Sequence, residues 1–198
     1  MSVFDSLASV YDRAMLPLEW LIFRRLRRRV LPPLEGDLLE LGAGTGVNLP
    51  LYKSAARVTA MDTSSDMLLW AARRETQHRV ALVCADVQRL PFASGHFDVV
   101  TGSLVFCSVA NPSRGLAEAR RVLRAGGRLV LLEHTRGRGL GAWLTDVLHP
   151  LWCTWSHECH LNRETVQAVV DAGFKLQRVE QHALGIVRVI KAVSQGHS

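Results

Sequence analysis

The segment Leu39-Glu-Leu-Gly-Ala-Gly-Thr-Gly46 carries the strongest structural signal in this 198-residue sequence. The leucine-rich segment over 37–41 predicts a short buried strand that leads into the glycines, and a helix is expected after them, over 48–54. A glycine-rich loop between a strand and a helix lets a ligand approach the backbone closely. The loop differs from a dinucleotide-binding loop because position 47 is Val47, and the sequence lacks the Gly-Lys-Ser/Thr of a phosphate-binding P-loop.

Carboxylates stand at the ends of three predicted strands. Glu40 lies just before the glycines, where its charge suits a cationic amine or sulfonium better than a pyrophosphate. Asp62 ends a second strand, 57–61, at a position where an acid accepts hydrogen bonds from two ribose hydroxyls. Asp86 follows a third strand, 80–84, and can accept a hydrogen bond from the exocyclic amine of an adenine. These three acids predict a nucleoside site at the carboxyl edge of a parallel sheet.

The rest of the pattern predicts an α/β fold. Helices and strands alternate at short spacing, which is typical of a parallel sheet. A helical segment over 4–31, broken near Pro17, is expected at the start, and Gly126 and Gly127 are expected to stop a helix over 112–124. The other predicted elements are helices over 64–77 and 163–172 and strands over 97–101, 128–132, 176–181 and 186–193.

The composition excludes several classes of protein. Hydrophobic residues make up 48% and charged residues 21%, which rules out a disordered, collagen-like or coiled-coil chain. The four Cys residues lack the spacing of a zinc module, and free thiols are expected in the reducing cytoplasm. The sequence shows neither the pattern of a signal peptide nor a stretch long enough to span a membrane. We therefore expect a cytoplasmic protein.

The formal net charge is +6, and five Arg residues fall within Arg24–Arg29. Such a balance is compatible with an anionic partner, which could be nucleic acid, a membrane surface or an acidic substrate. The arginine run lacks the interleaved aromatic residues that stack on bases, so we expect no nucleic acid partner. Two interpretations stay open: the helix contacts a membrane surface peripherally, or it is a solvated face that covers the core.

Over roughly residues 36–134, the sequence resembles the class I S-adenosylmethionine-dependent methyltransferases. The resemblance rests on Glu40-Leu-Gly-Ala-Gly-Thr-Gly46, Asp62, Ala85-Asp86 with Leu90-Pro-Phe92, and Val122-Leu-Arg-Ala-Gly-Gly-Arg-Leu129. It implies a Rossmann-like, doubly wound α/β sheet of seven strands with the last strand antiparallel. It also implies a single domain made of an N-terminal helical cover (1–35), a cofactor-binding core (36–134), a substrate-side insert and helix (135–173) and closing strands (174–198).

The resemblance also implies a cofactor and the residues that bind it. The methyl donor would be S-adenosyl-L-methionine and the product S-adenosyl-L-homocysteine, with no metal ion required. The resemblance implies that the glycines lie beside the methionine part of the cofactor. It also implies that Asp62 binds the ribose and that Asp86 and Val87 flank the adenine. The implied cofactor-binding residues are Tyr11, Glu40, Gly42, Ala43, Gly44, Gly46, Asn48, Asp62, Thr63, Met67, Ala85, Asp86, Val87, Ser103 and Leu104.

Three segments bear on the methyl acceptor. The run over 102–109 lacks the Asn-Pro-Pro-Tyr or Asp-Pro-Pro-Tyr associated with methylation of amino groups on bases or glutamine. His149-Pro-Leu-Trp152 and Cys159-His-Leu-Asn-Arg-Glu-Thr165 resemble the thiol S-methyltransferase branch called methyltransferase-like seven. That resemblance implies a small lipophilic thiol as acceptor. The candidate substrate-binding residues are Cys107, His149, Trp152, His157, Cys159, His160 and Arg163.

His134 is the candidate catalytic residue. It follows the fifth predicted strand at the carboxyl edge, where open α/β sheets bind ligands. A thiol with an unperturbed pKa near 8.5 is mostly protonated at pH 7, so a neighbouring histidine could draw off its proton. The alternatives are a phospholipid N-methyltransferase or a quinone-precursor methyltransferase at a membrane surface and, in another class, a non-catalytic cofactor- or nucleic-acid-binding module. The sequence indicates no obligate protein partner.

Overall fold

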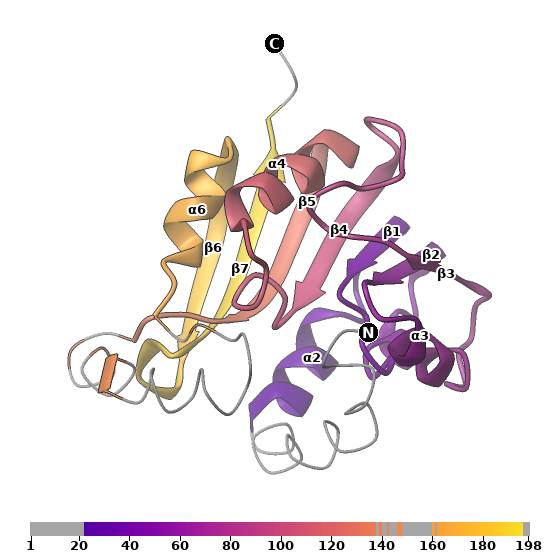
Figure 1. Ribbon diagram of the computed structural model, residues 1–198, viewed down its shortest axis with the longest axis horizontal. Coiled ribbons are helices and arrows are strands. Elements are labelled where there is room, and N and C mark those ends of the chain that lie inside the picture. Colours follow the sequence, from indigo (N-terminus) through magenta and orange to yellow (C-terminus); the bar gives the residue numbers. More distant parts are fainter. Residues whose placement is uncertain are drawn as a thin grey trace. The chain divides into compact units, whose positions relative to one another are not determined.

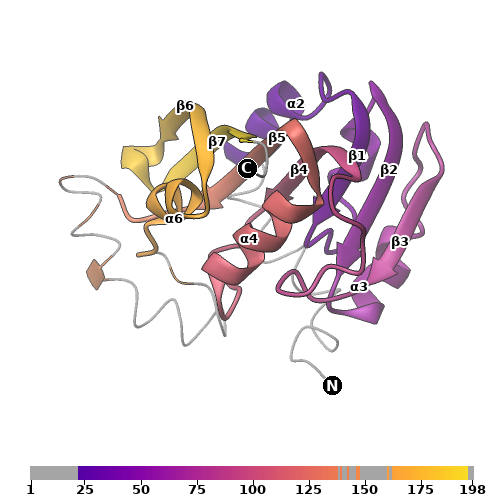
Figure 2. The ribbon, with the colours of Figure 1, turned by 90° about the horizontal axis from the view of Figure 1, so that it is seen from above.

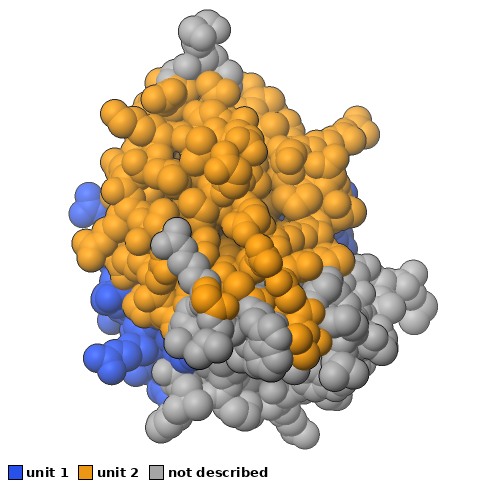
Figure 3. Space-filling view, turned by 90° about the vertical axis from the view of Figure 1, so that its left-hand side faces the viewer, with its two compact units in different colours: residues 1–86 blue, residues 87–198 orange. Residues whose placement is uncertain are grey.

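The computed structural model describes residues 22–137, 139, 142, 146–147, 160 and 162–195. Within this part of the chain, seven strands form one mixed sheet in the order β3-β2-β1-β4-β5-β7-β6. This arrangement confirms the predicted α/β sheet with antiparallel closing strands. The chain divides into two compact units, residues 1–86 and 87–198, which Figure 3 separates by colour. The single-domain organisation stays a prediction.

Unit 1 is built on three parallel strands. Its elements are α2 (Arg24–Val30), β1 (Gly36–Leu41), the short 3-10 turn η2 (Leu49–Leu51), β2 (Ala55–Asp62), α3 (Ser65–Ala71) and β3 (Val80–Cys84). β2 pairs in parallel with both β1 and β3, so the carboxyl ends of all three strands lie at one edge. Leu38, Leu39 and Leu41 of β1 are completely buried, as expected for a strand covered on both faces.

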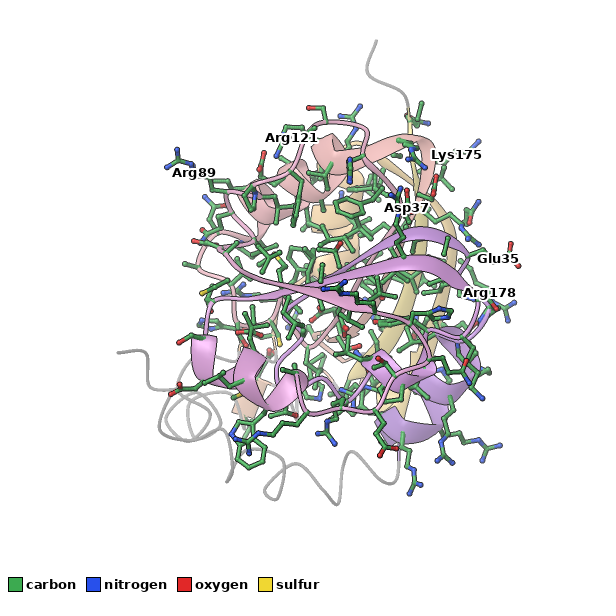
Figure 4. All side chains as sticks on the ribbon, turned by 90° about the vertical axis from the view of Figure 1, so that its right-hand side faces the viewer. Glu35, Asp37, Arg89, Arg121, Lys175 and Arg178 are labelled. Carbon is green, nitrogen blue, oxygen red and sulfur yellow. The ribbon has the colours of Figure 1, made fainter. Side chains whose placement is uncertain are left out.

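Side chains fix the two ends of this small sheet. At the amino end of β1, Asp37, labelled in Figure 4, accepts two hydrogen bonds from the Arg57 guanidinium of β2, at 2.7 and 2.6 Å. At the carboxyl end of β2, the Ser64 hydroxyl accepts a hydrogen bond from the N–H of Met67 and caps α3. Among the described residues, no helix is long and apolar enough to cross a bilayer.

Two predicted helices of unit 1 are shorter than expected. The helix predicted over 48–54 is only η2, because β2 begins at Ala55 and the Asn48 side chain is drawn into a hydrogen bond with Glu40. The helix predicted over 64–77 ends at Ala71. Beyond that point the Arg74 guanidinium donates to the carbonyl of Thr45 at 2.8 Å, so tertiary contact takes precedence over helix propensity.

The described part of unit 2 is built on four strands and on the helices α4 and α6. Its elements are β4 (Phe97–Ser103), α4 (Pro112–Val122), β5 (Leu123–His134), α6 (Thr165–Asp171), β6 (Phe174–His182), the 3-10 turn η3 (Ala183–Gly185) and β7 (Val187–Ser194). β4 and β5 are parallel, whereas β7 runs antiparallel to both β5 and β6. Helices α4 and α6 lie side by side on one face of these strands (Figures 1 and 2).

The two glycines expected to stop a helix have a different role. α4 ends at Val122, and β5 begins with the next residue. Within β5, residues 124–127 form a bulge against β4. Gly126 has a φ of +76°, and a Cβ on Gly127 would lie 2.9 Å from the carbonyl oxygen of Arg124. The glycines therefore shape a bulge inside a strand.

Candidate functional site

The glycine loop, residues 42–46, follows β1 at the carboxyl edge of unit 1. Its three glycines have φ values of +59°, +54° and +77°, a left-handed conformation that residues with a Cβ adopt only under strain. The N–H of Ala43 donates to the carbonyl of Met61 on β2 at 2.8 Å, which fixes the loop to the neighbouring strand. The loop is therefore specified by its glycines and held by the sheet.

Two glycines of the loop differ in their surroundings. A Cβ on Gly46 would lie 2.9 Å from the Cα of Ala71 in α3, so this glycine permits close packing of the loop against the helix. A Cβ on Gly44 would meet no heavy atom within 4 Å. The loop is thus packed at Gly46 and open at Gly44, where a ligand can approach the backbone.

Glu40 of β1 is a fully buried carboxylate beside this loop. Its Oε1 accepts a hydrogen bond from Nδ2 of Asn48 at 2.6 Å, and within the described residues its Oε2 is buried without a hydrogen-bond partner. Burial raises the pKa of Glu40 to about 7, although Asn48, Tyr52 and Arg27 act to lower it. A buried carboxylate with an unsatisfied oxygen is suited to a cationic ligand, because burying a charge is costly without compensation.

Asp62, at the end of β2, holds the glycine loop closed. Its Oδ2 accepts a hydrogen bond from the N–H of Gly44 at 2.8 Å, and its Oδ1 accepts one from the N–H of Ser64 at 3.0 Å. A carboxylate has about four lone-pair positions, so an acid can accept hydrogen bonds from several donors at once. The carbonyl of Asp62 accepts from the N–H of Ala85 at 3.0 Å, which ties the end of β3 to the end of β2.

The other predicted residues of unit 1 lie at or near the same edge. Asp86 is exposed just after β3, Thr63 is exposed just after β2, and Met67 is buried in α3. The parallel register places Asp62 opposite Cys84, two residues before Asp86. The structure therefore brings the three predicted acids to the carboxyl edge of one three-stranded sheet.

The β4 loop, residues 104–109, follows β4 in unit 2. Ser103 ends β4 half-buried, and Leu104 has a φ of +60°, which is strained for a residue other than glycine. Cys107 is buried. Val87, the predicted adenine neighbour, is also buried in unit 2. Residues of other segments that hydrogen-bond to the β4 loop include Leu132, Glu133, His160 and Arg163.

Two neighbouring residues at the end of β5 face in opposite directions. Glu133 directs its buried carboxylate to N–H groups of the β4 loop. Successive side chains of a strand alternate between faces, so the buried His134 lies on the other face. Sequence reasoning singled out His134 and missed Glu133. The signal was an acid at the carboxyl end of a strand, a property that Glu133 shares with Asp62 and Asp86.

Part of the predicted site falls outside the described residues, namely Tyr11, His149, Trp152, His157 and Cys159. His160 and Arg163 are described, and both contact the β4 loop. In the described part of the chain, no group of three or more His, Cys, Asp or Glu side chains could hold a metal ion.

Comparison with known proteins identifies the class. A family model described as a methyltransferase domain matches residues 39–131, a range that includes the glycine loop, Asp62 and Asp86. The human protein named thiol S-methyltransferase TMT1A is 33% identical over 182 residues, which cover 86% of this chain and 74% of that protein. The chain belongs to the S-adenosylmethionine-dependent methyltransferase family. It is an enzyme of that class, and its cofactor is S-adenosyl-L-methionine.

Other relatives carry different names. Demethylmenaquinone methyltransferase of Clavibacter sepedonicus is 39% identical over 138 residues, which cover 67% of this chain and 56% of that protein. A crystal structure of an S-adenosylmethionine-dependent methyltransferase from Thermotoga maritima has a TM-score of 0.76 at 21% identity, covering 97% of this chain and 98% of that one. At that identity the structural likeness supports the fold alone.

The residues of unit 1 fit this cofactor. The buried Oε2 of Glu40 offers a negative partner for the cofactor's ammonium group, and this oxygen has no hydrogen-bond partner among the described residues. The open space at Gly44 leaves room for a ligand against the backbone. The first feature would be unfavourable without a ligand, because a buried acid with an unsatisfied oxygen is costly.

Proposed function

We propose that this enzyme transfers the methyl group of S-adenosyl-L-methionine to the sulfur of a small lipophilic thiol. The extent of the match to human thiol S-methyltransferase TMT1A is the observation that carries the proposal. An alignment that covers 86% of the chain includes much of residues 135–173, where the substrate-side residues are predicted. The methyltransferase domain model, in contrast, matches only residues 39–131.

In methyl transfer the protein mainly has to bind the cofactor and the thiol and to orient them for reaction. The bound cofactor supplies a methyl carbon on a positively charged sulfur; the thiol sulfur forms a bond to that carbon as the old carbon–sulfur bond breaks. In this proposal Glu40 binds the cofactor's amino group, Asp62 accepts hydrogen bonds from the ribose hydroxyls, and Asp86 accepts one from the adenine amine. The products are a thioether, S-adenosyl-L-homocysteine and the proton of the thiol.

A screen of methyl acceptors with labelled cofactor tests the proposal. The panel contains alkyl thiols of increasing chain length, sulfide, a demethylated quinone precursor and phosphatidylethanolamine. We expect transfer to the alkyl thiols, with kcat/KM rising roughly threefold to fourfold for each methylene that becomes buried. Transfer to the quinone precursor with none to any thiol would contradict the proposal.

The cofactor assignment is tested by calorimetry with S-adenosyl-L-homocysteine. Asp62→Ala removes both the acceptor for the ribose hydroxyls and the hydrogen bond to Gly44, so we expect affinity to fall by at least about tenfold. Glu75→Gln, at an exposed position in the same unit, is the matched control and should leave the affinity unchanged. Wild-type affinity in Asp62→Ala would show that the ribose role is wrong.

The role of His134 as general base also remains a proposal. It is supported by its place at the carboxyl end of β5 and by its burial. His134→Ala should lower the rate of thiol methylation more than it lowers cofactor affinity. Equal losses in the two measurements would indicate a structural role instead.

Quinone-precursor methylation is the second candidate. The specific observation in its favour is the 39% identity to the Clavibacter sepedonicus demethylmenaquinone methyltransferase, which exceeds the identity to human TMT1A over a shorter alignment. In that reaction a ring carbon takes the place of the thiol sulfur. The acceptor screen separates the two candidates directly, because both substrate classes compete for the same labelled methyl group.

Peripheral membrane contact through α2 is proposed as an accessory property. The helix buries Leu26, Arg27 and Val30 and exposes four arginines, namely Arg24, Arg25, Arg28 and Arg29. Each arginine near an anionic bilayer can contribute about 1 kcal/mol of attraction. Replacing the four exposed arginines with Gln should abolish co-sedimentation with anionic vesicles. Equal sedimentation of the wild type with neutral and anionic vesicles would exclude this role. The cytoplasmic location stays a prediction.

A further inference from the structure

The β4 loop is a short turn whose backbone is unusually constrained. It begins at Leu104, whose left-handed φ of +60° persists only where surrounding contacts hold it. The Leu104 N–H donates to the carbonyl of Leu132 on β5 at 2.8 Å. The N–H groups of Ser108 and Val109 both donate to the carbonyl of Val105, at 2.9 and 3.2 Å, so the loop closes into a single turn.

One carboxylate holds the N–H side of this turn. Glu133 of β5 accepts hydrogen bonds from the N–H groups of Val105 at 3.0 Å, Phe106 at 3.1 Å and Cys107 at 3.3 Å. Its side chain is completely buried, so these bonds compensate for water that the carboxylate has lost. Three consecutive N–H groups directed at one anion leave the turn little freedom to change conformation.

One guanidinium holds the carbonyl side of the same turn. Nη1 of Arg163 donates to the carbonyl of Phe106 at 2.7 Å and to that of Val109 at 2.6 Å. The carbonyl of Cys107 accepts from the N–H of His160 at 2.9 Å. The carbonyl of Arg163 in turn accepts from the N–H of Arg136 at 3.2 Å, just beyond the end of β5.

The two charges meet at one peptide unit, the one that joins Phe106 to Cys107. Its N–H donates to Glu133 and its carbonyl accepts from Arg163, so the anion and the cation both stabilise one orientation of that peptide dipole. The acid comes from β5 and the cation from the segment before α6, so the β4 loop, β5 and that segment are fixed to one another within unit 2. Neither residue needs to touch substrate to have this effect.

We propose that Glu133 and Arg163 are positioning residues that hold the β4 loop in the one conformation that orients the methyl acceptor. This inference rests on the proposed function, because it takes the loop after β4 as part of the acceptor site. In-line transfer depends steeply on alignment, and a displacement of about 1 Å can lower a rate by roughly a hundredfold. Loss of either charge should therefore reduce turnover while the cofactor residues of unit 1 keep their contacts.

The test uses Glu133→Gln and Arg163→Met in the full chain. The first variant is isosteric but presents an amide N–H to the turn, and the second removes the cation. We expect kcat to fall roughly tenfold to a hundredfold on the best acceptor found in the screen. The affinity for S-adenosyl-L-homocysteine should stay within about twofold, and hydrogen exchange at Val105–Cys107 should become about tenfold faster.

Three further variants make the result specific. Arg163→Lys keeps a cation that can donate to both carbonyls, and it should restore most of the turnover lost in Arg163→Met. The matched controls are Glu75→Gln and Arg178→Met, at exposed positions remote in sequence from the loop, and both should behave as wild type. Thermal unfolding followed by circular dichroism establishes that each variant is folded.

The outcomes separate this inference from the proposed function. Unchanged turnover with faster exchange would overturn the positioning role, and so would equal losses of turnover and cofactor affinity. If the wild type methylates quinone precursors and no thiol, the proposed function is contradicted but the positioning role is not. Turnover of the variants is then measured with the quinone precursor as acceptor. If the wild type methylates nothing in the panel, unchanged exchange at Val105–Cys107 in both variants would still overturn the inference.

Discussion

Glu40 shows how a single residue can be costly to the apo protein and useful to the holoenzyme. Its carboxylate is buried, and burial raises its pKa from an ordinary 4.5 to about 7. Near neutral pH the folded apo protein therefore binds a proton that the unfolded chain has released. A cationic ligand would reverse this preference, because a nearby positive charge favours the ionised carboxylate.

Glu40 should make the stability of the apo protein fall as pH rises. A group whose pKa is higher in the folded state contributes stability below its unfolded pKa and loses it as pH rises through its folded pKa, here between about 4.5 and about 7. Glu40→Gln lacks this titration and should gain on the order of 3 kcal/mol relative to wild type between pH 4 and pH 8. Urea unfolding at several pH values measures the difference, and parallel curves would contradict the prediction.

At the scale of single residues, the sequence predicted where the acids of the site lie better than it predicted which hydrogen bonds they make. Glu40, Asp62 and Asp86 were predicted from their place at strand ends, and the structure brings them to one edge. The loop-closing hydrogen bond of Asp62 to Gly44 was not predictable, because it depends on a backbone turn that only the fold creates. Glu133 carries the same strand-end signal as Asp62 and Asp86, but its role was not predictable, because its partners are three backbone N–H groups.

The glycine loop is the element whose sequence is least replaceable, and two of its glycines form a matched pair. Gly46→Ala adds a Cβ at a positive φ and 2.9 Å from the Cα of Ala71, so we expect a loss of roughly 2 to 4 kcal/mol. Gly44→Ala carries the strain of the positive φ alone, with no heavy atom within 4 Å, and should cost about 1 kcal/mol. Urea unfolding tests this order of stabilities.

For cofactor affinity, in contrast to stability, Gly44 is the glycine of this pair at which a substitution should matter. If the open space at Gly44 receives the cofactor, Gly44→Ala should weaken S-adenosyl-L-homocysteine binding although the variant remains folded. Calorimetry measures this effect. Wild-type affinity in Gly44→Ala would show that the space at Gly44 has no part in binding.

Arg121 of α4, labelled in Figure 4, links this helix by hydrogen bonds to the segment that follows β3. Arg121 donates to both carboxylate oxygens of Glu118 and to the carbonyls of Leu90 and Phe92, all within 2.9 Å. Glu118 also accepts from the N–H of Leu90 at 2.8 Å. This network explains why the Leu90-Pro-Phe92 motif lies fixed against α4.

Arg121→Met should destabilise the protein in a pH-dependent way. The hydrogen bond from Arg121 lowers the pKa of Glu118, so the stabilisation is present above the ordinary value of 4.5 and is lost as pH falls below it. Because the pair is partly exposed, we expect a loss of about 1 to 2 kcal/mol at pH 7, shrinking toward pH 3. Lys175→Met, exposed on β6, is the control; a loss independent of pH would contradict the prediction.

Element types were predicted better than element ends. All seven strands were predicted near their observed places, because apolar runs and strand-end acids mark them. The end of α3 at Ala71 and the short η2 were missed, since contacts of Arg74 with Thr45 and of Asn48 with Glu40 decide them. Tertiary hydrogen bonds of this kind leave no periodic pattern in the sequence.

At the scale of the whole molecule, β7 is the strand that joins β6 to the rest of the sheet. β7 pairs with β5 on one side and β6 on the other. Ile190 of β7 is completely buried and lies opposite Leu131 and Val179. Ile190→Pro should therefore destabilise unit 2 by more than about 3 kcal/mol, whereas Ile190→Val should cost about 1 kcal/mol. Hydrogen exchange across β5 and β6 measures the effect, and protection equal to wild type in the proline variant would contradict it.

The position of β7 also sets an order of events during protein synthesis. A ribosome makes β5 and β6 before β7, yet β6 pairs with no other strand in the described chain. Until β7 emerges, β6 and one edge of β5 present unpaired backbone groups, which are sites of aggregation and of capture by chaperones. The edge of β5 therefore stays unpaired until residues 187–194 have left the ribosome, and slower translation of that segment should prolong the exposure.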